Sequence, residues 1–267
     1  MVFNIDKKGF IINDGSLDKI QNKLKPILEE IINFSKEKLG DNFLSAYVRG
    51  SVSVGNFIDD ISDIDFIVVS KEEPSEENFS DFLNYSLGLD NKYAWVKGFD
   101  LFLVSKYNLL NSSDLNKLRV YLSTQSVLLN GADLSTDLIR YKPDRELSKV
   151  LLSEIDQEFL FLHNIFSSEE QNFSYNNQIR SLKFWCIWMS RVVLRFALYA
   201  SLEKHHSYTN DLRDCYSIVS KIYPELEPEL LLALKWSQSP IDDGAVLKNY
   251  FEKISFKIKN IFLIDNK

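Results

Sequence analysis

The sequence contains little that could cross-link it or bind zinc. Its 267 residues include only two cysteines and three histidines. Cys186 and Cys215 stand far apart and form no Cys-x-x-Cys pair, and the histidines show no metal-binding spacing. The pattern therefore indicates neither a disulfide framework nor a zinc site, and both thiols are expected to be buried.

Long apolar segments are also missing. The N-terminal residues lack the apolar run of a signal peptide. The longest apolar span, residues 185–200, contains Arg191 and Arg195 and is too short to cross a bilayer comfortably. We expect this span to be a buried helix, and we expect the chain to be cytoplasmic with no membrane partner.

Positive charge is scarce as well. Lys and Arg number 31 against 38 Asp and Glu, which gives a net charge of −7. A long nucleic-acid footprint requires clustered Lys and Arg to neutralise phosphates, so no nucleic-acid partner is expected. A small cationic ligand fits this balance better, although solubility is the simpler explanation of the charge.

The most informative stretch is residues 47–69, YVRGSVSVGNFIDDISDIDFIVV. Gly50-Ser51 is followed, after eleven residues, by Asp63-Ile64-Asp65 at the start of an apolar strand. Side chains two residues apart on a strand share a face, so the two carboxylates form a pair suited to Mg²⁺. Gly50 allows a close approach of the backbone, and Ser51 can cap a short helix whose free amides attract phosphate. Each feature alone would be explained by an ordinary turn or a solvated strand end.

The order Gly-Ser, about a dozen residues, then Asp-hydrophobic-Asp resembles the signature of the nucleotidyltransferase fold of the DNA polymerase β superfamily. Within that superfamily, the stretch is similar to bacterial streptomycin/spectinomycin (aminoglycoside) adenylyltransferases and their uncharacterised relatives. In that superfamily a third acid on a later strand completes the metal site. Asp100, inside the strand-like run 97–104, is the candidate. Its alternative is an edge acid that faces water.

The resemblance implies a mechanism. Asp63, Asp65 and Asp100 would bind one or two Mg²⁺ ions, while Gly50 and Ser51 would bind the phosphates of the co-substrate ATP. Asp100 would also act as the base for the acceptor hydroxyl, although relatives often have the longer Glu there. AMP would pass to a small cationic acceptor such as an aminoglycoside antibiotic, with release of pyrophosphate, and this reaction confers antibiotic resistance.

The acceptor is open at this point. Asp59, Asp60 and Asp63 cluster beside the motif and would suit a polyamine, or they simply solvate a loop. A protein acceptor, nucleotidylated (AMPylated) by a regulatory or antitoxin-like enzyme, is the alternative function. A second alternative is a nucleotide-binding module that has lost its chemistry.

The elements before and after residue 141 differ in kind. The first part predicts strands at 46–48, 63–69, 97–104 and 126–129, with helices from Ser16 (bent at Pro26), after Gly50, at 75–87 (closed by Gly88) and at 114–122. The second part predicts only helices, at 144–166, 178–204, 210–222, 225–236 and 244–261. We therefore expect an α+β protein, with a mixed-sheet nucleotidyltransferase domain at 1–141 and a C-terminal α-helical bundle at 142–267.

The helical half contributes weaker candidates for nucleotide binding. Arg191 and Arg195 lie one turn apart, and Arg180 lies about three turns earlier on nearly the same line. Guanidinium groups grip phosphate oxygens in a fork, so triphosphate is one possible partner. Acids of the bundle, such as Glu154 or Asp156, are the other.

Tyr208 and Asp211 are the candidates for substrate binding, through ring stacking and a carboxylate. The alternative for this segment is a helix junction in which Thr209 or Asn210 caps the next helix.

Overall fold

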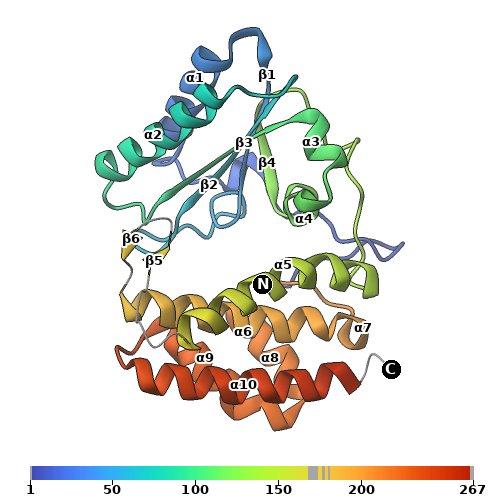
Figure 1. The fold of residues 1–267 in the computed structure, drawn as a ribbon. Coiled ribbons are helices and arrows are strands. Elements are labelled where there is room, and N and C mark those ends of the chain that lie inside the picture. Colours follow the sequence, from blue (N-terminus) through green and yellow to red (C-terminus); the bar gives the residue numbers. More distant parts are fainter. Residues whose placement is uncertain (1, 168–173, 176–177, 180, 265–267) are drawn as a thin grey trace. The chain divides into compact units, whose positions relative to one another are not determined.

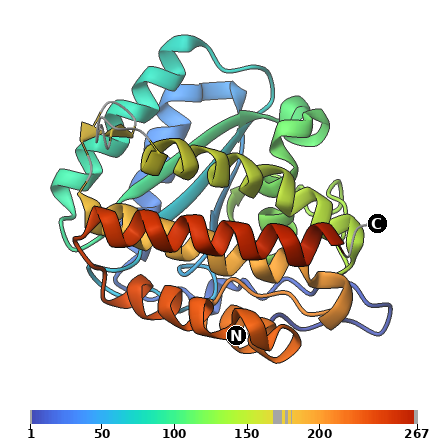
Figure 2. The same cartoon turned by 60° about the horizontal axis from the view of Figure 1, so that its bottom comes forward.

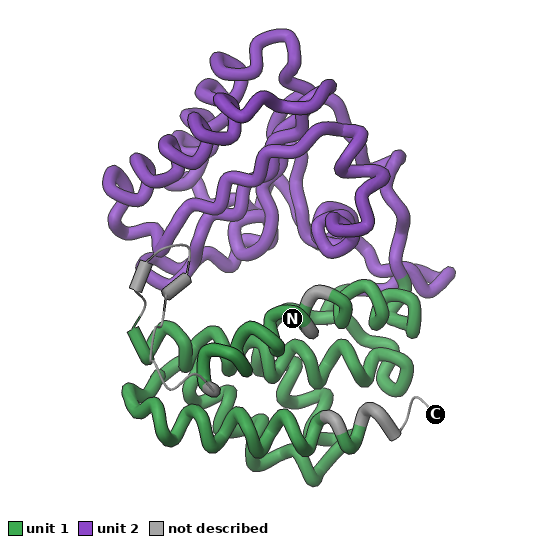
Figure 3. Tube along the Cα trace, in the orientation of Figure 1, with its two compact units in different colours: residues 1–3, 142–267 green, residues 4–141 purple. Residues whose placement is uncertain are grey.

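A computed structural model describes residues 2–167, 174–175, 178–179 and 181–264. The chain divides into two compact units (Figures 1 and 3). The sheet unit is Asn4–Tyr141, and the helical unit is Lys142–Lys267 together with Met1–Phe3. No helix in the described ranges is long and apolar enough to span a membrane.

The sheet unit is built on a four-stranded sheet with the strand order β3-β2-β1-β4. The strands are β1 (Phe43–Arg49), β2 (Ile64–Ser70), β3 (Phe99–Ser105) and β4 (Ser126–Gly131). β2 runs parallel to β3, whereas β1 runs antiparallel to both β2 and β4. The carboxyl end of β1 therefore meets the amino ends of the other three strands.

The strand register brings charged residues together at that end of the sheet. Arg49 lies opposite Asp65 on one side and Ser126 on the other, and Asp65 lies opposite Asp100. Residues directly opposite each other on adjacent strands project from the same face. Arg49, Asp65 and Asp100 consequently share one face of the sheet.

Helices cover both faces of this sheet (Figure 1). α1 (Lys25–Leu39) and α2 (Glu76–Lys92) pack on one face, and α3 (Lys106–Asn111) and α4 (Asn116–Thr124) pack on the other. The α1/α2 face carries Ala46, Val48, Ile64, Phe66, Val68 and Leu103; the α3/α4 face carries Tyr47, Ile67, Val69 and Val104. Because both faces are buried, the strands are nearly continuous apolar runs.

Two helix boundaries differ from the sequence prediction. Ser16 caps only a short 3₁₀ helix, Leu17–Lys19, and Pro26 lies in the first turn of α1 instead of bending a longer helix. In the first turn a missing N–H costs no hydrogen bond. Gly88 lies inside α2, which continues to Lys92. A glycine inside a helix costs only about 1 kcal/mol relative to alanine, so packing overrides it.

The helical unit is organised around α6, which contacts α5, α8, α9 and α10. Figure 2 brings α10 forward, where its packing against α5 and α6 can be followed. The helices are α5 (Arg145–Ser167), α6 (Leu182–Ala200), α7 (Leu202–His205), α8 (Leu212–Ile222), α9 (Glu227–Gln238) and α10 (Gly244–Ile264). The prediction of a buried helix is confirmed for α6, which begins after Ser181 because that side chain caps it.

One pair of strands departs from the all-helical prediction for this half. β5 (Ser174–Tyr175) and β6 (Gln178–Ile179) are two-residue strands that pair antiparallel. Apart from this pair, the predicted fold class is confirmed: the protein is α+β, with a mixed sheet followed by a helical part.

Candidate active site

Two of the three predicted acids meet at a single arginine. The Asp65 and Asp100 carboxylates, called the acid pair below, lie opposite each other on β2 and β3. One terminal guanidinium nitrogen of Arg49 lies 2.7 Å from Asp65 Oδ1 and 4.0 Å from Asp100 Oδ2. The Asp65 side chain is 17% exposed and that of Asp100 is 68% exposed. Asp100 is thus an exposed acid on an edge strand, and it also stands beside Asp65.

Arg49 is the residue that sequence analysis missed. Its guanidinium lies over the ring of Tyr121 in α4, 4.7 Å from the ring centroid. The Arg49 side chain is therefore positioned by the Tyr121 ring as well as by Asp65. A signal was present, because Arg49 directly follows the predicted apolar strand 46–48, and a charge at the end of such a strand needs a partner or water. The partner became identifiable only with the pairing of β1 and β2.

Gly50 makes room for the acid pair. Its φ of +69° lies in the left-handed region, which favours glycine. A Cβ at this position would lie 2.9 Å from Asp65 Oδ2. The expected close backbone approach therefore exists toward the Asp65 carboxylate. The approach of Gly50 to a phosphate stays a prediction.

The loop after Gly50 consists of turns, whereas the sequence predicted a short helix capped by Ser51. Val54 N–H donates to the Gly50 carbonyl at 3.3 Å, which closes a single helical turn that does not continue. The Ser53 hydroxyl secures this turn, since its oxygen lies 2.9 Å from the Gly50 carbonyl oxygen and 2.7 Å from that of Gln125. The capping role predicted for Ser51 is wrong.

Several polar groups of this loop have no protein partner. Within the described part of the chain, the backbone N–H groups of Ser51, Val52 and Ser53 donate no hydrogen bond, and the Ser51 hydroxyl oxygen is buried without one. Consecutive free amides form a concavity that suits anions. Since unmade hydrogen bonds of buried groups cost free energy, a ligand with acceptor oxygens would stabilise this loop.

Asp63, the predicted metal ligand that is not part of the acid pair, immediately precedes β2 and is exposed. Across residues 2–167, 174–175, 178–179 and 181–264, no three His, Cys, Asp or Glu side chains gather closely enough to hold a metal ion. The structure therefore brings Asp65 and Asp100 together without assembling a triad that includes Asp63. The metal-binding and catalytic roles of these three residues stay predictions.

The donor chemistry of the acid pair fits Mg²⁺. This ion is usually held by one or two carboxylates, with waters and substrate phosphates in its other positions. Asp65 and Asp100 supply two carboxylates from adjacent strands, and a cationic nitrogen of Arg49 already lies close to both. The same oxygens are therefore suited to a divalent cation.

Arg191 and Arg195 lie on α6 of the helical unit, and both are partly buried. Arg195 acts on a neighbouring thiol: burial raises the pKa of Cys215 to about 12, and the Arg195 charge opposes this shift. The predicted binding of triphosphate by both arginines stays a prediction. Arg180 and the side chains of Glu154 and Asp156 lie outside the described residues.

Tyr208 is a core residue of the helical unit. It is 1% exposed, and its ring stacks on that of Phe3 with the centroids 5.3 Å apart. The ring of Tyr199 lies 6.2 Å away. The structure consequently offers no exposed face of Tyr208 for the predicted stacking on a base or drug ring.

Asp211 is the N-cap of α8. Its Oδ1 accepts hydrogen bonds from the backbone N–H groups of Arg213 at 2.9 Å and Asp214 at 3.1 Å. The expectation that Thr209 or Asn210 would cap this helix is therefore wrong. The side chain of Asp211 has a structural role, and its contact with a substrate stays a prediction.

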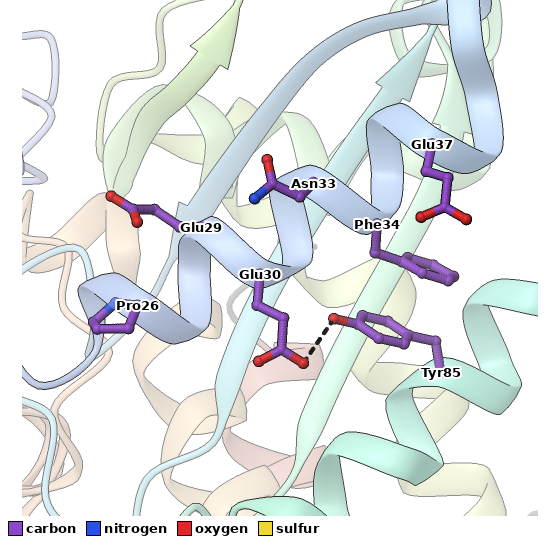
Figure 4. A pocket seen from close by; sticks show the side chains of 7 residues that line it. All are labelled: Pro26, Glu29, Glu30, Asn33, Phe34, Glu37 and Tyr85. Carbon is purple, nitrogen blue, oxygen red and sulfur yellow. Dashed lines mark hydrogen bonds between the residues drawn. The ribbon is translucent and has the colours of Figure 1, made fainter.

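A pocket with acidic lining residues lies between α1 and α2, which cover the face of the sheet opposite to Arg49 (Figure 4). Its lining residues are Pro26, Glu29, Glu30, Asn33, Phe34, Glu37 and Tyr85. Burial raises the pKa of Glu30, but hydrogen bonds from Lys92 and Tyr93 outweigh this effect and lower it. The central carboxylate is thus neutralised from within the fold, and none of the predicted site residues lines this pocket.

The mixed sheet, with its acid pair at one end and a helical unit after it, has the nucleotidyltransferase fold. The chain is similar to the crystal structure of spectinomycin adenyltransferase AAD(9) from Enterococcus faecialis with ATP and spectinomycin. The similarity covers 88% of this chain and 98% of that chain, with a TM-score of 0.55 and 15% sequence identity. No protein-family model matches the sequence, and no curated protein matches it. At this identity, the similarity establishes the fold alone.

Proposed function

We propose that the protein is a Mg²⁺-dependent nucleotidyltransferase that moves AMP from ATP to a hydroxyl group of a small cationic acceptor, of the aminoglycoside or aminocyclitol class. One observation carries the proposal: Asp65 of the acid pair lies directly beside the Gly50–Ser53 loop, in which the Ser51, Val52 and Ser53 amides have no partner among the described residues. A carboxylate pair next to an anion-binding loop suits a metal-bound triphosphate. The fold, which is that of an adenyltransferase crystallised with ATP and spectinomycin, supports this reaction class.

Each group of residues has its own role in the proposed reaction. The Ser51–Ser53 amides and the Ser51 hydroxyl bind the outer phosphates, and Asp65 and Asp100 hold the metal. When bound, Mg²⁺ neutralises phosphate charge and stabilises the attacking and leaving oxygens. Asp100, which is the more exposed acid, takes the proton of the acceptor hydroxyl. The acceptor oxygen then bonds to the α-phosphorus, the bond from that phosphorus to the bridging oxygen breaks, and pyrophosphate leaves.

Exposed carboxylates in the loop that leads into β2 support a cationic acceptor. Asp59, Asp60 and Asp63 are all exposed in the loop between β1 and β2. Asp59 already forms an ion pair with Lys23, so Asp60 and Asp63 are the carboxylates of this loop that we assign to the acceptor. A polyamine acceptor would be drawn to the same region by its charge.

The test is transfer from α-labelled ATP with Mg²⁺, run against a panel of aminoglycosides and aminocyclitols and, in parallel, against whole-cell protein extract. We expect label on a small molecule, and we expect Asp65→Asn and Asp100→Asn to lower transfer by about 10²-fold or more. Asp81→Asn is the matched control, because it removes a carboxylate of the same unit that pairs with Lys38, at 2.9 Å, away from the acid pair.

Each outcome has a distinct meaning. Label on a protein band would replace the proposal with the protein-nucleotidylating alternative. ATP binding without transfer to either acceptor class would leave a nucleotide-binding module. Full transfer by Asp65→Asn would refute the active-site assignment, whatever the acceptor.

A further inference from the structure

The acid pair already has a cation, and that cation belongs to the chain. The terminal nitrogen of Arg49 that lies 2.7 Å from Asp65 Oδ1 also lies 4.0 Å from Asp100 Oδ2. Two carboxylates opposite each other on adjacent strands repel, and a positive charge close to both reduces this repulsion. Arg49 supplies this charge in the protein without ligands.

We propose that Arg49 is a resident counter-cation of the acid pair, and that a divalent cation must displace it in order to bind. The inference rests on the proposed function only in taking Asp65 and Asp100 as the metal ligands. An ion within bonding distance of both carboxylates would compete with the guanidinium for the same oxygens and would be repelled by its charge. Arg49 therefore weakens metal binding in the absence of nucleotide.

The geometry favours displacement over a role in orienting Asp65 for the metal. An orienting residue needs only one of the two carboxylates, whereas the Arg49 nitrogen donates a hydrogen bond to Asp65 Oδ1 and, at 4.0 Å, is also within ion-pair distance of Asp100 Oδ2. The ring of Tyr121 gives the guanidinium a second contact, at 4.7 Å, which does not depend on either acid. Arg49 can thus leave the acid pair without losing all of its partners.

The test measures Mn²⁺ binding, from the electron paramagnetic resonance signal of the free ion, without nucleotide or acceptor. We expect Arg49→Gln to bind Mn²⁺ about three- to thirtyfold more tightly than the unchanged protein, because it removes both the competitor and its repulsion. Arg140→Gln is the matched control. Arg140 pairs with Asp6 at 2.6 Å and lies 4.7 Å from the Phe10 ring centroid, so it reproduces the arrangement away from the acid pair.

Tighter binding by Arg49→Gln, with Arg140→Gln unchanged, supports the proposal. Unchanged or weaker binding by Arg49→Gln overturns it, and so does a lack of Mn²⁺ binding by both proteins. Should Arg49→Gln fail to fold by circular dichroism, Arg49→Lys decides. A lysine ammonium grips a carboxylate pair less well than a guanidinium fork, so tighter binding than in the unchanged protein is again expected, and equal or weaker binding refutes the inference.

Failure of this inference differs from failure of the proposed function. Metal affinity is measured here without any transfer reaction. Loss of the proposed function would appear as the absence of label transfer by the unchanged protein, whatever the Mn²⁺ affinities of the Arg49 variants.

Discussion

Substitution of Gly50 by alanine tests the packing between the loop and the acid pair. The new Cβ would lie 2.9 Å from Asp65 Oδ2, and φ is +69°. An L-residue in the left-handed region costs about 1–2 kcal/mol. The smaller entropy of the unfolded chain offsets about 0.4–1 kcal/mol of this cost, so the net loss in the free energy of unfolding is about 1 kcal/mol. The carboxylate must also shift, and a displacement of about 1 Å lowers catalysis by about 10²-fold.

Urea denaturation and kcat/KM for nucleotidyl transfer separate the two effects. Gly40→Ala is the control, because Gly40 also has a positive φ, of +52°, but has nothing within 4 Å of the new Cβ. Both variants should lose stability, and only Gly50→Ala should lose transfer. Equal kcat/KM values for the two variants would refute the argument that Gly50 makes room for Asp65.

Two further predictions concern stability. The hydrogen bond from Arg140 lowers the pKa of Asp6 from its ordinary 3.8 to about 2. The Asp6 carboxylate therefore stabilises the fold at pH values above its unfolded pKa, and this stabilisation is lost as the pH falls through about 2. Asp6→Asn should therefore lose less thermal stability than the unchanged protein between pH 5 and pH 2; parallel pH profiles would contradict this. Glu229 is 4% exposed, and its Oε1 lies 2.8 Å from the ammonium groups of both Lys253 and Lys257. Glu229→Gln should lower the free energy of unfolding of the helical unit by about 1–3 kcal/mol in chemical denaturation, and no measurable change would disprove a stabilising role for this cluster.

The sequence alone predicted much of the fold because its signals are local. Apolar runs indicated the four strands of the sheet, and helical periodicity indicated the helices after residue 141. The errors fall where tertiary context outweighs local preference. Gly50 and Ser51 indicated a capped helix, but Ser53, bound to the distant Gln125 carbonyl, holds that segment as a turn. Gly88 indicated a helix end, but packing carries α2 past it.

Local sequence signals likewise predicted part of the candidate site. The spacing of Gly50, Asp63 and Asp65 identified the motif, since the alternation of side chains along a strand is a property of the sequence. Asp100 could be selected only as an isolated charge within an apolar strand. Its place beside Asp65 depends on the parallel pairing of β2 and β3, which no local pattern specifies.

What the sequence by itself determined is where the candidate acids stand along the chain and the division between a mixed sheet and helices, because these follow from residue type and periodicity. What only the tertiary structure decided is that the Arg49 guanidinium lies beside the acid pair. Arg49 reaches the acid pair through strand register, and Tyr121 supports it from a helix that is distant in sequence. The tertiary structure also decided the environment of Tyr208. The sequence predicted that its ring stacks on a ligand, but the ring is buried in the core, because burial of an aromatic side chain is a property of the folded chain.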